Sequence, residues 1–297
     1  MILRRLLRTP LRRLAVWARD VGPPGPADVV GDGLPAGSEV RLRVAVAGDV
    51  GHPSPQLDAT VAAMVRASAA RPFDALVLLG DNVYPDGDPA LLDQAVLRPF
   101  APVLTQGARL VPVLGNHDVQ AGHADVLVRR LGMPGRWYAS RLGDVLFVGL
   151  DSTRPDDADQ QAWLADTLAG CDAAWTVVAL HHPPYSAGWH GSDLSVRAAF
   201  EPAFRRFSVD LVLAGHEHDY QRSRPVGDTT YVISGAATHL RPTARADFTA
   251  VAFSTHHFLD LRVVGDHLHL QAVDHGGRIF DSVALPARAA AAGRPPA

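Results

Sequence analysis

The sequence predicts an α/β protein with a single domain, because short buried strands alternate with amphipathic helices over most of its length. The alternation runs from about residue 41 to about residue 285. Several of its strands are nearly continuous apolar runs, as is typical of parallel strands covered on both faces. The chain has 297 residues, of which 47% are hydrophobic and 20% are charged, and these values suit a globular protein with one sizeable core.

Three strands with two helices between them open the expected domain. This order predicts a parallel sheet with right-handed crossovers. Asp88 is the type of residue that caps a helix at its N-terminus. The strands are expected at 41–47, 75–79 and 109–114, and the helices at 57–70 and 89–104.

The second half of the domain begins with two adjacent strands and continues with further strands and helices. Its last three strands are expected to be antiparallel. The strands are expected at 137–140, 145–150, 175–180, 209–214, 230–234, 253–263 and 267–273, and the helices at 160–168 and 196–207.

Both ends of the chain differ from this pattern. Residues 1–40 are a basic N-terminal segment followed by a linker rich in Pro and Gly, and residues 286–297 are expected to be a disordered tail. Arginines and leucines at roughly helical spacing in residues 1–20 predict a surface helix or a tail, with weak contact to an anionic membrane surface as the alternative. We find no clear signal peptide or membrane-spanning stretch, and therefore expect a cytoplasmic protein.

The composition argues against several classes of function. The net charge of −3 makes a stable nucleic-acid partner unexpected. All 28 basic residues are arginine, so no lysine is available for Schiff-base chemistry. Cys171 is the only cysteine, which excludes an internal disulfide and a cluster of metal-binding thiolates.

Five of the expected strands end in residue types that bind metals. Ligands bind at the carboxyl ends of strands in α/β sheets, so five such ends meeting at one edge would gather oxygen and nitrogen donors. Asp, Asn and His without thiolates suit iron, manganese or zinc. Taken singly, each residue could instead cap a helix or occupy a turn. The strand ends carry Asp49; Asp81 with Tyr84; Asn116 with His117; His181; and His216 with His218.

The number of candidate ligands indicates two metals rather than one. A single catalytic zinc needs about three protein ligands, whereas seven or eight candidates follow these strands. Two metals about 3.5–4 Å apart stabilise both oxygens of an in-line displacement. The pattern therefore predicts phosphoester chemistry.

In this order, the blocks resemble the calcineurin-like metallophosphoesterase superfamily over about residues 41–285. The blocks that carry the resemblance are Asp49, Gly80-Asp81, Gly115-Asn116-His117-Asp118, His181 and Gly215-His216-Glu217-His218. The resemblance implies a single-domain, two-layered mixed β-sandwich flanked by helices, with a dinuclear metal centre between its loops.

A finer resemblance is to the small, mammalian-type purple acid phosphatases. It rests on Gly48-Asp49-Val50-Gly51 and on Gly80-Asp81-Asn82-Val83-Tyr84. The tyrosine at this place in those enzymes binds ferric iron, so the resemblance implies Fe³⁺ together with Fe²⁺, Zn²⁺ or Mn²⁺. The alternative is that Tyr84 is a plain turn residue before Pro85.

The resemblance also implies a role for each candidate residue. His181 is preferred to His182 as a ligand because the family pattern is His-x-Pro. The first metal would be bound by Asp49, Asp81, Tyr84 and His218, and the second by Asp81, Asn116, His181 and His216, with Asp81 bridging. The expected catalytic proton donors are His117 and His190, and the expected substrate-binding residues are Asn116, His117, His182 and His190.

These assignments predict a phosphatase. The expected reaction is hydrolysis of phosphomonoesters in a small phosphorylated substrate by attack of a metal-bound hydroxide. A phosphodiesterase that acts on cyclic nucleotides, nucleic acid or lipid head groups is the first alternative, because fold does not determine substrate. A non-catalytic metal-binding scaffold is the second alternative.

Overall fold

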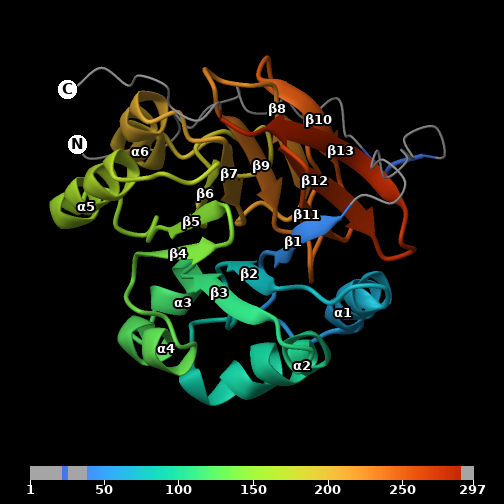
Figure 1. Cartoon of the computed structure of the whole chain (residues 1–297). Helices are drawn as coiled ribbons and strands as arrows, with labels where there is room; N and C mark the ends of the chain where they lie inside the picture. The colour runs from blue at the N-terminus through green and yellow to red at the C-terminus, as the bar shows by residue number, and fades with distance from the viewer. Residues whose placement is uncertain (1–21, 26–38, 289–297) are drawn as a thin grey trace, which may run out of the picture.

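Two β-sheets lie against each other at the centre of the protein, and helices flank both of them (Figure 1). The computed structural model describes residues 22–25 and 39–288. One sheet has six strands in the order β13-β12-β11-β1-β2-β3, and the other has seven in the order β10-β8-β9-β7-β6-β5-β4. The predicted two-layered mixed sandwich is therefore confirmed.

The six-stranded sheet combines a parallel and an antiparallel part. Strands β1, β2 and β3 are parallel, as the sequence predicted, and β11, β12 and β13 extend the sheet from β1 in antiparallel order. The carboxyl ends of the three parallel strands consequently lie side by side. The strands are β1 (Val40–Ala47), β2 (Ala75–Leu79), β3 (Arg109–Val113), β11 (His257–Val264), β12 (His267–Asp274) and β13 (Ile279–Pro286).

The seven-stranded sheet has a parallel centre and antiparallel margins. Strands β5, β6, β7 and β9 are parallel, whereas β4, β8 and β10 pair antiparallel with their neighbours. The strands are β4 (Tyr138–Leu142), β5 (Val145–Gly149), β6 (Trp175–Ala179), β7 (Leu211–Ala214), β8 (Tyr220–Ser223), β9 (Thr230–Ser234) and β10 (Thr249–Phe253).

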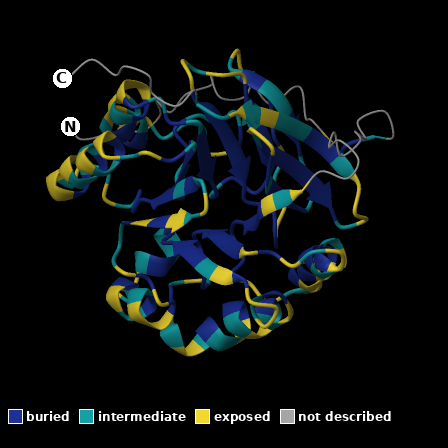
Figure 2. Ribbon diagram, in the orientation of Figure 1, coloured by how far each residue is buried: buried dark blue, intermediate teal, exposed yellow. Residues whose placement is uncertain are grey.

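The helices cover the outer faces of the two sheets. Helices α1, α2, α3 and α4 lie on the side of the six-stranded sheet, and α5 and α6 lie on the side of the seven-stranded sheet (Figure 1). Phe200 and Phe204 of α6 pack in one buried cluster with Val178 and Val212 of the sheet beneath. Figure 2 shows the strands almost wholly buried and the helices exposed along their outer faces. The helices are α1 (Pro55–Ser68), α2 (Arg98–Leu104), α3 (Asn116–Val119), α4 (Ala124–Arg130), α5 (Ala158–Ala169) and α6 (Leu194–Arg206).

The helix predicted at 89–104 is three short segments. A 3₁₀ turn, η2 (Pro89–Leu91), is followed by a π-helical turn, η3 (Asp93–Leu97), and then by α2. Prolines inside α2 lack the N–H that an α-helical hydrogen bond needs, which keeps the segment from forming one regular helix. The predicted cap is confirmed, because the Asp88 side chain accepts a hydrogen bond from the Ala90 N–H at 2.9 Å.

Two predictions about the last strands were wrong. The run 253–263 is not one strand, because Phe253 ends β10 in one sheet and His257 begins β11 in the other, with three residues crossing between the layers. The segment 230–234 forms β9, which is antiparallel to β8 but parallel to β7. Strands β8, β10 and β13 and helices α3 and α4 were not predicted from the sequence.

The chain ends lie partly outside the described residues. The predicted N-terminal helix or tail at 1–20 falls outside them, and so does most of the linker. At the other end, Pro286 still belongs to β13, and the Arg288 guanidinium pairs with Asp210 at 2.7 Å, so ordered structure reaches into the segment assigned to the tail. Within 22–25 and 39–288, no helix has the length and the apolar character needed to cross a membrane.

Candidate metal centre and active site

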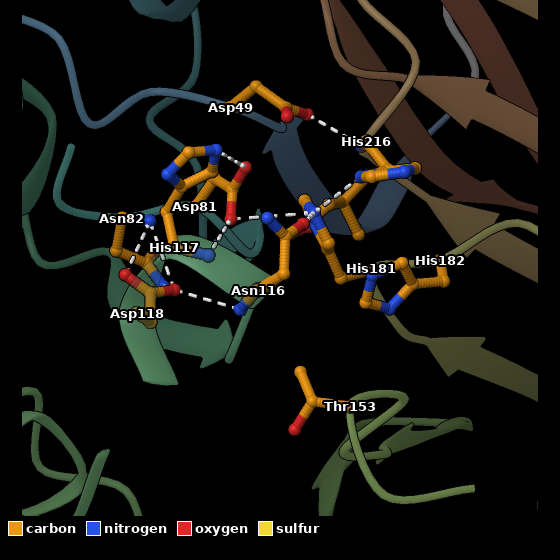
Figure 3. Close-up of polar contacts among 12 residues, drawn as sticks. Asp49, Asp81, Asn82, Asn116, His117, Asp118, Thr153, His181, His182 and His216 are labelled. Carbon is orange, nitrogen blue, oxygen red and sulfur yellow. Dashed lines mark hydrogen bonds and ion pairs between the residues drawn. The ribbon is translucent and has the colours of Figure 1, made fainter. Parts of the chain in front are cut away.

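The strand ends with metal-binding residues converge where the two sheets meet. Asp49, Asp81 and Asn116 follow β1, β2 and β3 of the six-stranded sheet, and His181 and His216 follow β6 and β7 of the seven-stranded sheet. Figure 3 shows these side chains pointing toward one another from both layers. The site is thus built by two sheet edges rather than by one.

The backbone at these strand ends turns sharply to direct the side chains into the site. Asp49, Asp81 and His216 have φ values of 59°, 51° and 69°, in the left-handed region that costs an L-residue about 1–2 kcal/mol. Gly80 has a φ of 86°, and a Cβ there would lie 2.7 Å from Nδ1 of His181. Backbone strain at these residues indicates that the position of the side chains has been favoured over local stability.

The first set of donors surrounds the phenol of Tyr84. Its hydroxyl lies 3.0 Å from Oδ2 of Asp81, 3.2 Å from Oδ1 of Asp49 and 3.4 Å from Nε2 of His218. The His218 and Asp49 atoms are themselves 3.4 Å apart. Ligands about 2.0–2.2 Å from one ion lie about 3.0–3.5 Å from each other, so this spacing fits a metal ion.

The second set of donors surrounds Nε2 of His181. This atom lies 3.0 Å from Oδ1 of Asn116, 3.3 Å from Nδ1 of His216 and 3.4 Å from Oδ1 of Asp81. Nδ1 of His181 is 2.8 Å from the Leu79 carbonyl oxygen, which leaves Nε2 free to act as a ligand. The spacing again fits one ion, and Asp81 presents a different oxygen to each set.

The charges of the site suit multivalent cations. Burial, and then Asp49 and Asp81, raise the pKa of Tyr84 well above its usual range. Burial opposes ionisation of Asp81, but His181 outweighs it and holds the pKa of Asp81 well below its usual range. Burial lowers the pKa of His181, whereas Asp81 raises it, with a net rise to about 9. Two carboxylates around one phenol make a strongly electronegative site, which a metal ion would neutralise.

Asp118, which the sequence suggested only as a possible turn residue, braces the oxygen-rich side of the site. Its buried carboxylate accepts hydrogen bonds from the backbone N–H groups of Asn82, Val83 and Gly115 at 2.8–3.1 Å. It thereby ties the loop after β2 to the loop after β3. Burial, and then the charge of Asp81, raise the pKa of Asp118 to about 6. Its place at the end of Gly115-Asn116-His117-Asp118 was the available sequence signal.

The two candidate proton donors lie beside the metal-binding residues. The His117 ring packs against Tyr84, with centroids 4.6 Å apart, and its Nδ1 makes a short contact with the Pro85 carbonyl oxygen. The His190 ring stacks on His216, with centroids 4.3 Å apart. Both histidines line a cavity of about 390 Å³ that also reaches Asp81, Tyr84, Asn116, His216 and His218.

His182, the fourth expected substrate-binding residue, does not line this cavity. Its Nδ1 lies 3.0 Å from Oγ of Ser152, and its ring packs against His181 and His216. Figure 3 shows its ring on the side of His181 that faces away from Asn116. Burial, and then His181, lower the pKa of His182 to about 4. His182 nevertheless belongs to a group with His181 and His216 whose ring nitrogens lie within 4.8 Å of one another and could hold a metal ion.

Three consecutive lining residues, His239, Leu240 and Arg241, were not selected from the sequence. His239 and Arg241 reach the cavity from the loop after β9. The ring of His239 stacks on His218, with centroids 5.6 Å apart. Their only sequence signal was their place in a loop beyond Gly235-Ala236-Ala237, because none of them belongs to a strand-end block.

A two-layered sandwich with Asp, Asn, His and Tyr donors at the meeting edge defines a metal-binding fold of the phosphoesterase type. Residues 42–220 match the family model described as calcineurin-like phosphoesterase, and the chain belongs to this family. The family implies a dinuclear metal site, and two groups of described residues could hold a metal ion, namely His181 with His182 and His216, and Asp49 with Asp81 and His181.

Named relatives point in two directions within the family. The chain is 30% identical over 213 residues to purple acid phosphatase 21 of Arabidopsis thaliana, and the aligned region covers 64% of this chain and 46% of that protein. It is 32% identical over 179 residues to a cAMP/cGMP dual specificity phosphodiesterase of Mycobacterium tuberculosis, covering 56% of this chain and 55% of that one. The chain therefore spans about half the length of these relatives.

A solved structure of a purple acid phosphatase from yellow lupin seeds has the same fold. It superposes with a TM-score of 0.73 and 18% sequence identity, covering 85% of this chain and 55% of the lupin chain. The predicted resemblance to the metallophosphoesterases and to purple acid phosphatases is confirmed by these matches.

Proposed function

We propose that the protein is a metal-dependent hydrolase of phosphate monoesters, similar to the purple acid phosphatases. The observation that carries the proposal is the position of Asp81. Its Oδ2 lies 3.0 Å from the Tyr84 hydroxyl and its Oδ1 lies 3.4 Å from Nε2 of His181, so one carboxylate serves two donor sets. A shared carboxylate is what a pair of metal ions about 3.5–4 Å apart requires.

Seven residues would bind the two ions in this proposal. Bound there, the ions would supply Lewis acidity toward the phosphoryl oxygens and an activated water nucleophile. Asn116 contributes a neutral oxygen, so it binds without adding negative charge to the second set. The proposed ligands are Asp49, Asp81, Tyr84 and His218 for the first ion, and Asp81, Asn116, His181 and His216 for the second.

The first set favours ferric iron in this proposal. The pKa of Tyr84 is raised well above its usual range, so the phenol loses its proton only to a strongly polarising cation. Fe³⁺ meets this condition better than a divalent ion does. The second set contains two imidazoles and one amide, which suit Fe²⁺, Zn²⁺ or Mn²⁺.

His117 and His190 would protonate the leaving group. Both line the cavity, and each contacts a different donor set. His117 packs against Tyr84 of the first set, whereas His190 stacks on His216 of the second. Histidine suits proton transfer because its ordinary pKa lies near neutral pH. Asn116 and these two histidines would also contact the bound phosphoryl group. The substrate in this proposal is a small phosphorylated molecule.

Hydrolysis of phosphodiesters is the second candidate. It is favoured by the 32% identity to the cyclic-nucleotide phosphodiesterase, which is slightly higher than the identity to the plant phosphatase. A diester carries one negative charge and two organic substituents, whereas a monoester carries two charges and one substituent. The two candidates can therefore be separated with chemically matched substrates.

The test compares 4-nitrophenyl phosphate with bis(4-nitrophenyl) phosphate, using protein whose metal content has been measured. We expect kcat/KM for the monoester to exceed that for the diester by at least about tenfold, with both activities lost in chelator. A preference for the diester would favour the phosphodiesterase. Full metal occupancy with no hydrolysis of either compound would favour the non-catalytic scaffold.

A further inference from the structure

Arg241 is a cationic residue in the wall of the metal-site cavity. Histidines, an aspartate, an asparagine and a tyrosine supply the other polar lining, and among the described lining residues Arg241 alone carries a guanidinium or ammonium group. The side chain is half-buried. None of the proposed metal or proton-transfer roles uses it.

The backbone on both sides of this arginine is held in place. The Arg241 N–H donates to the His218 carbonyl oxygen at 2.9 Å, and the Arg241 carbonyl oxygen accepts from Oγ of Ser254 at 2.9 Å. The first contact ties it to a proposed metal ligand, and the second ties it to the crossing between β10 and β11. The backbone of Arg241 is consequently fixed beside the candidate metal-binding residues, within reach of the cavity that its side chain lines.

Most hydrogen-bonding capacity of the Arg241 guanidinium is unused by the described residues. Its Nη1 lies 3.0 Å from Nε2 and 3.3 Å from Nδ1 of His190. A neutral imidazole has a single acceptor nitrogen, so His190 can accept at most one hydrogen bond from Arg241, whereas a guanidinium has five N–H donors. In the described part of the chain, no carboxylate lies within 4 Å of it, whereas nearby Arg278 pairs with Asp274 at 2.7 Å.

Arg241 also stands at the boundary between two hollows. Together with Leu240 it lines both the metal-site cavity and a neighbouring hollow of about 700 Å³ that extends past His256 and His275. A substrate that extends from the metal-site cavity into this hollow would therefore lie beside Arg241 and Leu240. An uncompensated positive charge at this place would attract a second anionic group on the same substrate.

We infer that Arg241 selects phosphomonoesters whose leaving group carries a second anionic group, either a carboxylate or another phosphoryl group. This inference rests on the proposed phosphatase function, and it names the substrate class of the same site. The metal ligands would hold the reacting phosphoryl group, and the guanidinium would bind the second anion through its planar pair of N–H donors.

The catalytic test compares glycerol 3-phosphate with 3-phosphoglycerate and glycerol 1,3-bisphosphate, whose leaving groups carry a carboxylate or a second phosphoryl group. We expect Arg241→Gln to lower the ratio of kcat/KM for a substrate with the second anionic group to that for glycerol 3-phosphate by about 30-fold, as expected for loss of a charge-assisted hydrogen bond. Arg241→Lys should restore part of the ratio. The substrate whose ratio falls further identifies the second group.

Arg245→Gln is the matched control, because Arg245 belongs to the same loop, is exposed and donates only to the Ala250 carbonyl oxygen among the described contacts. It should leave the ratio unchanged. Equal loss for all three substrates in Arg241→Gln would instead assign the arginine to the reacting phosphoryl group or to the placement of His190, and would overturn the inference. An unchanged ratio would also overturn it.

A binding experiment decides the matter even if the protein hydrolyses none of these compounds, whereas the proposed phosphatase function is decided separately by hydrolysis of 4-nitrophenyl phosphate. Isothermal titration calorimetry of the full-length, metal-loaded protein compares 3-phosphonopropionate with propylphosphonate, which lacks the carboxylate. We expect the first to bind at least about tenfold more tightly, and Arg241→Gln to abolish the difference. Equal affinities in the wild-type protein would overturn the inference.

Discussion

The two sheets contribute opposite kinds of donor to the site. The loops after β1, β2 and β3 supply oxygen donors from Asp49, Asp81, Tyr84 and Asn116, whereas those after β6 and β7 supply imidazoles. The two carboxylates thus lie on one layer and the imidazoles on the other. Neither layer alone holds a complete donor set, so metal binding depends on the alignment of the two sheets.

Each side is braced by a buried carboxylate of its own. Asp118 holds the loops after β2 and β3, and Glu217 accepts from the N–H groups of His190 and Gly191 and from Oγ of Ser186. Both carboxylates are fully buried. The oxygen-rich side is therefore braced between strand ends, whereas the imidazole-rich side is braced to the loop that carries His190. The difference predicts that the two sides tolerate substitution differently.

Removing the shared carboxylate should have the largest effect. Asp81→Ala deletes an oxygen from both donor sets, so we expect loss of bound metal and a fall in kcat of at least about a thousandfold, because Lewis-acid stabilisation is worth several kcal/mol. Metal analysis and 4-nitrophenyl phosphate hydrolysis measure both effects. Asp58→Ala on the exposed surface of α1 is the control. Two tightly bound ions in Asp81→Ala would show that the layers do not share a ligand.

Substitution of Tyr84 tests the oxygen-rich side by itself. In the iron-loaded, oxidised protein, a phenolate ligand should give a charge-transfer band in the visible spectrum, and Tyr84→Phe should abolish it. We expect kcat to fall by roughly tenfold or more, since the remaining ligands still place the ion. Tyr138→Phe is a suitable control, because the Tyr138 hydroxyl donates to the Pro112 carbonyl oxygen away from the site. If the iron-loaded, oxidised wild-type protein is colourless, Tyr84 does not bind the iron and is a turn residue before Pro85.

The strand ends were predictable because a parallel strand is a local signal. Each apolar run that ends in Gly-Asp, Gly-Asn-His or Gly-His places its polar residues at the carboxyl edge, and right-handed crossovers bring such edges together. The first sheet order and the metal-binding residue types followed from this pattern. The sequence could not show which ring nitrogen of each histidine faces the site, or which oxygen of Asp81 faces each donor set. These details depend on contacts between segments that lie far apart in the sequence.

The remaining errors have the same origin. Strand β9 at 230–234 lies between β7, to which it is parallel, and β8, to which it is antiparallel. The four-residue strand β8 is too short to show a clear periodicity in the sequence. The segment 253–263 was predicted as one strand, but residues 254–256 cross between the sheets, so Phe253 ends β10 and His257 begins β11. Glu217 and Arg241 make their hydrogen bonds with residues of other loops. A single charged residue in the sequence gives no local signal of such contacts.

The smallest expected effect concerns the interface between the layers away from the metal site. His257 of β11 is fully buried, and its ring lies edge-on to Tyr220 of β8, with centroids 5.2 Å apart. Its Nδ1 lies 2.9 Å from the Thr255 carbonyl oxygen, whereas Nε2 has no hydrogen-bond partner among the described residues. Burial is the main cause that lowers the pKa of His257 to about 4.

This lowered pKa makes the interface acid-sensitive. The unfolded chain takes up the proton near pH 6.5 and the folded protein only near pH 4, so the stability contributed by neutral His257 is complete above pH 6.5 and is lost as the pH falls toward 4. The loss amounts to about 3 kcal/mol at most. In metal-free protein, His257→Asn should be less stable at pH 7 but should lose less stability between pH 7 and pH 4.5 in urea titrations. His267→Asn, at the partly exposed start of β12, should keep the wild-type difference. If the two variants had the same acid sensitivity, protonation of His257 would not contribute to it, and the contact between β11 and β8 would depend on apolar packing alone.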